Sequence, residues 1–363
     1  MKKLKNKIPV GLLGATGMVG QKLVCLLKNH PWFKVTYLAA SEKSAGKTYN
    51  QAVKGRWLQK EKIPKAVSKL NVYSIEKDIK IIAEKCSFVF SAISADREFI
   101  KRIEESYAGK GLPVVSNNSA HRWTFDVPMI IPEINPEHLD IIPVQKKNRG
   151  WKNGFIVTKP NCSLQSYVPL LFAWKNFSPE KAIVSTYQAV SGAGKTLKNW
   201  PEMEDNVVPY IGGEEEKSEK EPEKILAKIK KGEFVFKTLP KISANCVRVP
   251  VSDGHMATIN IKFKKKVSKE KLIKALKNFK NPLDRLNLPF APKPFLTYFK
   301  ESNRPQTQLD RDLRGGMGIS VGRIREDSVL GWKCVALSHN TIRGAAGGSI
   351  LTAELLVKKG YIK

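Results

Sequence analysis

The sequence lacks the features of membrane proteins and of disulfide-rich secreted proteins. No apolar run reaches the roughly 18 residues that a membrane-spanning helix needs. The five cysteines, at positions 25, 86, 162, 246 and 334, form an odd count without a C-x-x-C pair, which argues against a disulfide framework and a structural zinc site. These shortages predict a protein of the reducing cytoplasm that has no membrane partner and no metal.

Acidic residues are also scarce, because 33 of them face 63 basic ones and the net charge is +30 at pH 7. Such an excess can indicate a nucleic-acid-binding protein. However, the basic residues are spread along the whole chain and alternate with acidic ones, as in GGEEEKSEKEPEKILAKIKKGE. No nucleic-acid-binding module is recognisable. We therefore expect no specific nucleic-acid partner, and a non-catalytic basic binding protein remains the rival from another functional class.

The length of 363 residues predicts two domains. Residues 1–160 alternate strand-like and amphipathic helical runs, which predicts a parallel sheet covered by helices. Longer alternating strands in 161–340 predict a second, α+β domain with a mainly antiparallel sheet. The terminal segment 341–363 reads as a helix that returns to the first domain. The predicted fold class is therefore α/β, with a Rossmann-type domain followed by an α+β domain.

A glycine pattern follows the first predicted strand and opens a helix. Gly14, Gly17 and Gly20 form G-x-x-G-x-x-G, which differs from the commoner G-x-G-x-x-G. Glycines at a strand-to-helix turn let backbone N–H groups and the helix N-terminus hold a pyrophosphate. The alternative is that the glycines serve a tight turn alone. We interpret the pattern as a dinucleotide site.

The residues at the end of the second predicted strand indicate which nicotinamide cofactor binds. An NAD enzyme usually has a carboxylate there, which grips the ribose 2′-hydroxyl. This chain has Ser41, with Lys43 and Ser44 close by, and these side chains offer hydroxyl donors and a cation. That set suits a 2′-phosphate and favours NADP over NAD, although Glu42 lies between them.

The stretch KPNCSLQSYVPLLFAW places one cysteine where a helix is expected to begin. A free cysteine often serves as a small buried hydrophobe. Here, however, Pro160 ends the preceding element and Asn161 is a good N-cap, which puts Cys162 in the first helical turn. That position lowers a thiol pKa and favours the nucleophilic thiolate. Beside a redox cofactor, such a thiol predicts thioester and thiohemiacetal intermediates.

A nucleophilic thiol needs a proton acceptor, and His255 is the best candidate among five histidines. It follows an Asp-Gly turn at the start of a predicted strand. Arg248, seven residues earlier, lies on a strand that leads to the same turn. Its guanidinium could hold a substrate carboxylate through two hydrogen bonds.

Short motifs stand in a characteristic order along almost the whole chain: GLLGATGMVGQ, SAGKTY, SNNSAHR, KPNCS, YQAVSGAGK, GEEEKSEKEPEKIL, VRVPVSDGH, RPQTQLDRD, SVGRIRED and NTIRGAAGGSI. Together they resemble the aspartate-semialdehyde dehydrogenase family, in the branch found in archaea, fungi and some bacteria. The resemblance implies a dinucleotide-binding domain, 1–160 with 341–363, and a catalytic and dimerisation domain, 161–340.

The resemblance also implies roles for the residues that match the motifs. Cys162 would be the nucleophile and His255 the acid/base, while Asn161 and Gln188 would position the reacting carbonyl. Substrate groups would be held by four charged residues: Arg248 at the α-carboxylate, Glu214 at the ammonium group, and Arg122 and Lys217 at the phosphate. The E-x-x-K spacing to Lys217 selects Glu214 from three adjacent glutamates. Implied cofactor contacts are Gly14, Thr16, Gly17, Met18, Val19, Ser41, Lys43, Ser44, Ser191, Gly192 and Asn340.

The implied reaction is the reversible, NADPH-dependent reductive dephosphorylation of L-4-aspartyl phosphate to L-aspartate 4-semialdehyde. It passes through a cysteine thioacyl intermediate and serves lysine, threonine and methionine biosynthesis. The family also implies a homodimer or homotetramer. Two reductases of the same fold remain alternatives. N-acetyl-glutamyl-phosphate reductase typically has Tyr-Pro after the cysteine, where this chain has Ser163 and Leu164, whereas malonyl-CoA reductase shares the motifs of this branch.

Overall fold

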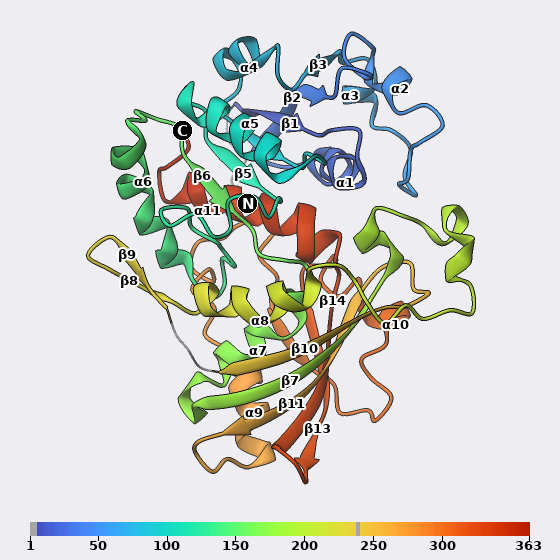
Figure 1. Ribbon diagram of the computed structural model, residues 1–363, viewed down its shortest axis with the longest axis vertical. Helices are drawn as coiled ribbons and strands as arrows, with labels where there is room; N and C mark the ends of the chain where they lie inside the picture. Colours follow the sequence, from blue (N-terminus) through green and yellow to red (C-terminus); the bar gives the residue numbers. More distant parts are fainter. Residues whose placement is uncertain (1–5, 237–239) are drawn as a thin grey trace.

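The computed structural model describes residues 6–236 and 240–363 and contains two six-stranded sheets, one in the upper and one in the lower half of Figure 1. The first sheet has the strand order β3-β2-β1-β4-β5-β6, and all its pairings are parallel. Its strands are β1 (Ile8–Leu13), β2 (Phe33–Ala40), β3 (Val72–Ser74), β4 (Phe88–Ser91), β5 (Val114–Ser116) and β6 (Ile156–Thr158).

Helices connect these strands, as the alternating pattern predicts. They are α1 (Met18–Leu27), α2 (Tyr49–Ala52), α3 (Lys65–Ser68), α4 (Ile79–Lys85), α5 (Arg97–Gly109) and α6 (Ile142–Arg149). β4 is buried along its whole length, as expected for a parallel strand covered on both faces. Local signals set the helix ends: the Asp96 carboxylate accepts a hydrogen bond from Phe99 N and caps α5.

The second sheet has the order β10-β7-β11-β14-β13-β12. Its three inner pairings are antiparallel, as predicted, but both edge strands pair in parallel. Its strands are β7 (Pro179–Gln188), β10 (Lys241–Arg248), β11 (His255–Phe263), β12 (Leu296–Tyr298), β13 (Ile319–Asp327) and β14 (Gly331–Ser338), and β8 (Lys228–Lys230) and β9 (Glu233–Val235) form a separate hairpin.

The helices of this half are α7 (Val168–Ala173), α8 (Glu214–Ile225), α9 (Lys269–Lys277) and α10 (Thr307–Asp310). α7 and α9 bury leucines against the inward-facing residues of the sheet, in one shared hydrophobic core. α8 lies between the two sheets in Figure 1. None of the helices in the described residues is long and apolar enough to cross a membrane.

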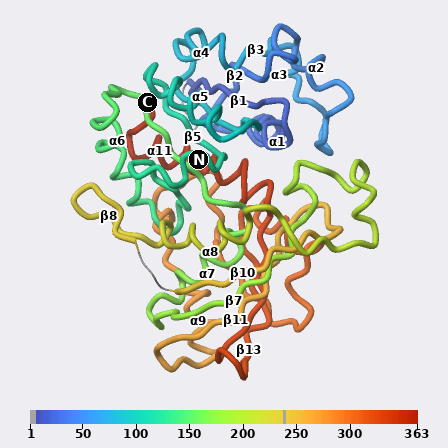
Figure 2. Tube along the Cα trace, viewed as in Figure 1, coloured from blue at the N-terminus to red at the C-terminus, as the bar shows by residue number. Residues whose placement is uncertain are grey.

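The C-terminal helix α11 (Gly347–Lys358) returns to the first sheet, and the red trace in Figure 2 lies among the green and blue ones. Residues 347–356 are all buried, and they share a hydrophobic core with β1, α1 and β2. This packing agrees with the returning helix expected from the sequence. The limits of the two domains, at 160 and 341, remain a prediction.

A buried polar contact fixes α11 to the first sheet. The carboxylate of Glu354 lies 2.8 Å from His30 Nε2, and both side chains are fully buried. His30 Nδ1 accepts hydrogen bonds from Trp32 N and Phe33 N, so Nε2 carries the proton and donates it to Glu354. Phe290 N also donates to this carboxylate.

We expect Glu354→Leu to lower the free energy of unfolding by at least about 2 kcal/mol, because it leaves the His30 and Phe290 donors without an acceptor. Glu354→Gln keeps one acceptor oxygen and should lose less than half as much. Denaturant unfolding followed by circular dichroism measures both. Equal losses in the two variants would contradict this role for the carboxylate.

Candidate active site

Three of the predicted site residues lie at one end of the second sheet. Gln188 is the last residue of β7 and pairs with Arg248, the last residue of the parallel neighbour β10. His255 is the first residue of β11, which pairs antiparallel with β7, so it starts where the other two strands end. The strand register therefore brings together residues that are 67 positions apart at most in sequence (188 to 255).

His255 is fully buried, and its ring is held in one orientation. Ala189 N donates to Nδ1 at 3.1 Å, and because a backbone N–H can only donate, the proton of the neutral ring is on Nε2. Nε2 has no hydrogen-bond partner in the described residues. Burial, aided by the charge of Arg248, lowers the pKa of His255 to about 3. The neutral ring thus presents a hydrogen-bond donor at Nε2.

Gly192 lies against both His255 and Arg248. A Cβ added to Gly192 would lie 2.7 Å from Arg248 Nη1 and 3.1 Å from His255 Nε2. Arg248 is only 5% exposed, and Nη1 donates to Ala189 O at 2.8 Å. Because Gly192 has no side chain, space remains beside the imidazole of His255 and the guanidinium of Arg248.

Cys162 lies at the start of a helical segment, but not in the first turn of an α-helix as predicted. It precedes a single 3₁₀ turn, Ser163–Ser166, and α7 begins only at Val168. Asn161 is not the N-cap as predicted, because Cys162 itself holds that position without a side-chain cap, but Asn161 Oδ1 does accept from Ser163 N at 2.8 Å. The predicted lowering of the thiol pKa is wrong. Burial, followed by the nearby charge of Glu214, raises the pKa of Cys162 to about 11, and one short turn cannot offset that.

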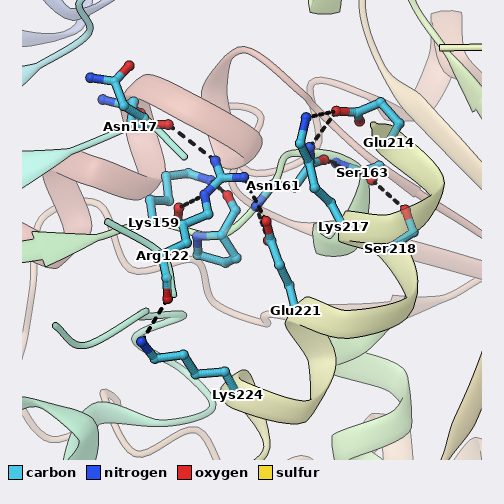
Figure 3. Close-up of polar contacts among 12 residues, drawn as sticks. Asn117, Arg122, Lys159, Asn161, Ser163, Glu214, Lys217, Ser218, Glu221 and Lys224 are labelled. Carbon is cyan, nitrogen blue, oxygen red and sulfur yellow. Dashed lines mark hydrogen bonds and ion pairs between the residues drawn. The ribbon is translucent and has the colours of Figure 1, made fainter. Parts of the chain in front are cut away.

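Helix α8 turns one charged face toward the cysteine turn (Figure 3). Glu214 Oε1 accepts from Asn161 Nδ2 at 2.8 Å and from Lys217 Nζ at 2.9 Å. Glu214 Oε2 accepts from Gln188 Nε2 at 3.3 Å. The glutamate that the E-x-x-K spacing selects is therefore the one joined to two predicted catalytic residues. Its neighbour Glu216 is exposed.

Arg122 is buried beside this face and is held by the protein through three nitrogens. Nε donates to Lys159 O at 2.9 Å, Nη1 to Glu221 at 2.8 Å and Nη2 to Asn117 O at 3.2 Å. A guanidinium has five N–H groups, so two remain for a substrate oxyanion.

Sequence reasoning missed two α8 residues that build the site. Glu221 bridges Arg122 and Asn161, because its second oxygen accepts from Asn161 N at 2.7 Å. Lys224 Nζ donates to Arg122 O at 2.7 Å and to Thr124 O at 2.9 Å. The signal was present: Glu214, Lys217, Glu221 and Lys224 are spaced 3, 4 and 3 apart, which places them on one helical face.

The glycine turn has the geometry that a nucleotide site requires. Gly14 has φ +78°, and a Cβ there would lie 2.3 Å from Ala92 O. Gly20 approaches Gly14 O equally closely, while Gly17 precedes α1 without a side-chain cap. The first N–H groups of α1 thus remain available to an anion.

A cavity of about 640 Å³ adjoins this turn at the carboxyl ends of β1, β2 and β4. It is lined by Gly14, Thr16, Gly17, Ser41 and Lys43 among the predicted cofactor residues, and also by Glu42 and Arg56. Glu42 is already paired: Ser74 Oγ donates to it, and Lys77 Nζ does so at 2.9 Å. These hydrogen bonds lower the pKa of Glu42.

Arg56 is a further basic residue that the sequence did not reveal, because it lies 15 positions after Ser41 in a loop. Its Nη2 donates to Ser44 Oγ at 2.7 Å. Ser44 itself is buried and lies behind the cavity rather than on its wall. The cavity therefore has a serine and two cations available to a 2′-phosphate.

A second cavity, of about 410 Å³, is lined by Met18 at the start of α1 and by Ser191, which follows β7. Asn340 donates to Ser191 Oγ at 2.9 Å and accepts from Gly254 N at 2.8 Å, so it stands directly behind this wall. Val19 packs into the hydrophobic core instead of lining either cavity.

The chain matches two protein-family descriptions: "Semialdehyde dehydrogenase, NAD binding domain" over residues 9–142 and "Semialdehyde dehydrogenase, dimerisation domain" over residues 169–343. It is 45% identical over 358 residues to the aspartate-semialdehyde dehydrogenase of Archaeoglobus fulgidus, with 97% of this chain and 99% of the relative covered. It is 42% identical to that of Methanothermobacter thermautotrophicus, with 96% and 99% covered.

Among solved structures, the chain is similar to the Candida albicans aspartate-semialdehyde dehydrogenase with NADP, at 39% identity and a TM-score of 0.87. The match covers 98% of this chain and 100% of that one. Sequence and fold agree over the full length of both domains, so the chain belongs to the aspartate-semialdehyde dehydrogenase family.

Proposed function

We propose that this protein catalyses the NADPH-dependent reductive dephosphorylation of L-4-aspartyl phosphate to L-aspartate 4-semialdehyde, in lysine, threonine and methionine biosynthesis. The observation that carries the proposal is the meeting of four groups at one end of the catalytic sheet. They are the cysteine turn, the Nε2–H of His255, the guanidinium of Arg248 and the carboxylate of Glu214.

Each group has a task in the proposed reaction. The sulfur of Cys162 attacks the acyl carbon, and phosphate leaves while Arg122 and Lys217 hold it. NADPH supplies the hydride that reduces the resulting thioester. The Nε2–H of His255 donates a hydrogen bond to the oxyanion and stabilises it, which is the part of the acid/base role that a neutral ring can perform. Arg248 binds the α-carboxylate and Glu214 the ammonium group, while Asn161 and Gln188 orient the thiol turn and the reacting carbonyl.

The cofactor assignment is supported by the cavity beside the glycine turn. Ser41, Lys43 and Arg56 offer a hydroxyl and two positive charges, and the carboxylate of Glu42 is neutralised by Lys77. The net positive charge of this site suits the 2′-phosphate of NADP better than the 2′-hydroxyl of NAD.

We also propose that the protein is a cytoplasmic homodimer or homotetramer that associates through the catalytic sheet. The family description of residues 169–343 as a dimerisation domain supports this. So does the outer face of β7, where Ile183 and Tyr187 are 44% and 37% exposed. All five cysteines are free, which fits a reducing compartment.

The proposed nucleophile is tested by Cys162→Ala and Cys162→Ser. Each should lower kcat at least about 1,000-fold, since losing the covalent path adds at least about 4 kcal/mol to the barrier. Binding of NADPH, measured by fluorescence, should persist. Cys86→Ala, at a buried thiol of the first domain, is the control. Retention of more than about a thousandth of the wild-type rate by Cys162→Ala would rule out the covalent mechanism.

The cofactor choice is tested by the ratio of kcat/KM for NADP to that for NAD, which should strongly favour NADP. Ser41→Asp should shift the ratio toward NAD, because a carboxylate repels the 2′-phosphate and accepts from the ribose. Glu42→Gln should leave it within about threefold, because Lys77 already compensates that charge. A wild-type ratio near one would overturn the assignment.

The substrate is tested by Glu214→Gln. For aspartate semialdehyde the change should cost about 2–4 kcal/mol in kcat/KM, because the ammonium group loses its partner. For malonate semialdehyde, which has no ammonium group, the loss should be smaller, because only the contacts of Glu214 with Asn161, Lys217 and Gln188 are changed. Glu216→Gln, on the exposed side of α8, is the matched control. Equal losses on both substrates would give Glu214 another role and would favour the malonyl-CoA alternative.

A further inference from the structure

The segment that leads into α11 forms a surface on which the nucleophile lies. Ile342–Ala346 make one π-helical turn, in which two N–H groups donate to the carbonyl groups five residues back. Turns of this kind are rare and are frequent at functional sites. A Cβ on Gly344 would lie 2.7 Å from Cys162 Cβ, and one on Gly348 would lie 2.8 Å from Lys159 Cε. The backbone at these glycines therefore contacts the cysteine and the residue three positions before it.

Arg343, in the same π-helical turn, joins this surface to the cysteine turn by a side-chain contact. Its Nε donates to Gln165 Oε1 at 3.2 Å, and Gln165 lies in the 3₁₀ turn that Cys162 precedes. Arg343 and Gln165 are only 1% and 2% exposed. The hydrogen bond therefore links the two turns next to the place where Gly344 packs against Cys162.

The guanidinium of Arg343 is itself held in one orientation. Its Nη1 and Nη2 donate to the two carboxylate oxygens of Glu133, which is fully buried in the segment between β5 and α6. Its central carbon lies 4.8 Å from the centroid of the Phe295 ring. A planar guanidinium with a bidentate carboxylate and an aromatic face has little freedom to turn. The charge of Arg343 is also balanced within the protein.

We propose that Arg343 is a positioning residue for Cys162, which holds the cysteine turn on the π-helical turn and thereby fixes the direction of the sulfur. The proposal rests on the function proposed above and adds a positioning residue to its mechanism. Arg343 acts through Gln165 and through the backbone of Gly344, and it has no contact with the reacting atoms in this role.

The local structure of the cysteine segment explains why such support is needed. Cys162 precedes a single 3₁₀ turn, and α7 begins only at Val168, so the segment lacks the hydrogen bonds of a continuous α-helix. A nucleophile must lie about 3–3.5 Å from the atom that it attacks, and a displacement of about 1 Å can lower the rate about 100-fold. The rigidity that the short turn lacks is supplied from outside by Arg343.

The experiment compares two variants that break the contact from either side. Gln165→Met removes the acceptor in the cysteine turn and leaves the pair of Arg343 with Glu133 intact. Arg343→Lys keeps a positive charge for Glu133, but one ammonium group cannot bind the carboxylate and Gln165 in the same geometry. Each should lower kcat for oxidation of aspartate semialdehyde at least about tenfold, and the double variant should be no slower than the slower single one.

The Michaelis constants separate positioning from a general loss of structure. KM for aspartate semialdehyde and for NADP should stay within about threefold of the wild-type values, because the substrate-binding groups and the glycine turn are unchanged. The concentration of folded enzyme is taken from the stoichiometry of NADPH binding, so that unfolded protein does not lower kcat. A wild-type kcat in either folded variant would overturn the proposal.

Hydrogen exchange followed by mass spectrometry tests the position of the cysteine turn without turnover. In both single variants, amides in a peptide that covers residues 161–167 should exchange at least about tenfold faster than in the wild type, because the turn has lost its anchor. A peptide that covers β7 should exchange as in the wild type. Unchanged exchange of residues 161–167 would overturn the proposal, whatever reaction the enzyme catalyses, whereas failure of the proposed function is shown by wild-type kinetics alone.

Arg149→Met is the matched control. Arg149 also binds a carboxylate through two nitrogens, that of Asp126, and its guanidinium carbon lies 5.1 Å from the centroid of the Trp151 ring. This pair has no contact with the cysteine turn, so the variant should keep kcat within about threefold and the exchange of residues 161–167 unchanged. A tenfold fall of kcat here would show that loss of any such pair has the same effect, and would overturn the special role of Arg343. Either Gln165→Met or Arg343→Lys decides the matter if the other fails to fold.

Discussion

The buried carboxylate of Glu221 is the interaction on which the site depends. One oxygen accepts from the guanidinium of Arg122 and the other from the backbone of Asn161, so a single side chain fixes the phosphate-binding arginine and the cysteine turn relative to each other. Both charges of the pair are almost fully buried. A buried carboxylate is stable only when such partners satisfy it, and removing one partner is strongly destabilising. The geometry of the site is therefore set by α8, although α8 supplies no nucleophile and no acid.

Much of the fold was predictable because its signals are local. The parallel first sheet follows from short apolar runs that alternate with amphipathic helices. The glycine turn follows from positions where a larger side chain would collide with the backbone. The parallel edges of the second sheet were not predictable. β10 pairs with β7 although β8 and β9 lie between them in sequence, and β12 pairs in parallel with the strand that follows it, β13; neither β10 nor β12 carries a sign of a parallel partner.

The site was predictable where a residue type is rare and a motif surrounds it, as for Cys162 and His255. It was not predictable where the residue type is abundant. Glu221 and Lys224 belong to a run of alternating charges that reads as a solvated surface, and only the packing of α8 against the cysteine turn buries them. The error in the thiol pKa has the same origin. Sequence identifies a helix start, but it does not show that the helix is one short turn and that the sulfur lies among buried groups.

The return of the chain end to the first sheet has a consequence for synthesis of the protein. Cys162 and Lys159 rest on Gly344 and Gly348, and Gly344 is synthesised 182 residues after Cys162 (162 to 344). Until then the first sheet also lacks α11, whose apolar residues fill its core. A nascent chain therefore holds its reactive thiol in an unfinished pocket. A translation product that stops before residue 344 therefore carries the cysteine but not the surface against which it is placed.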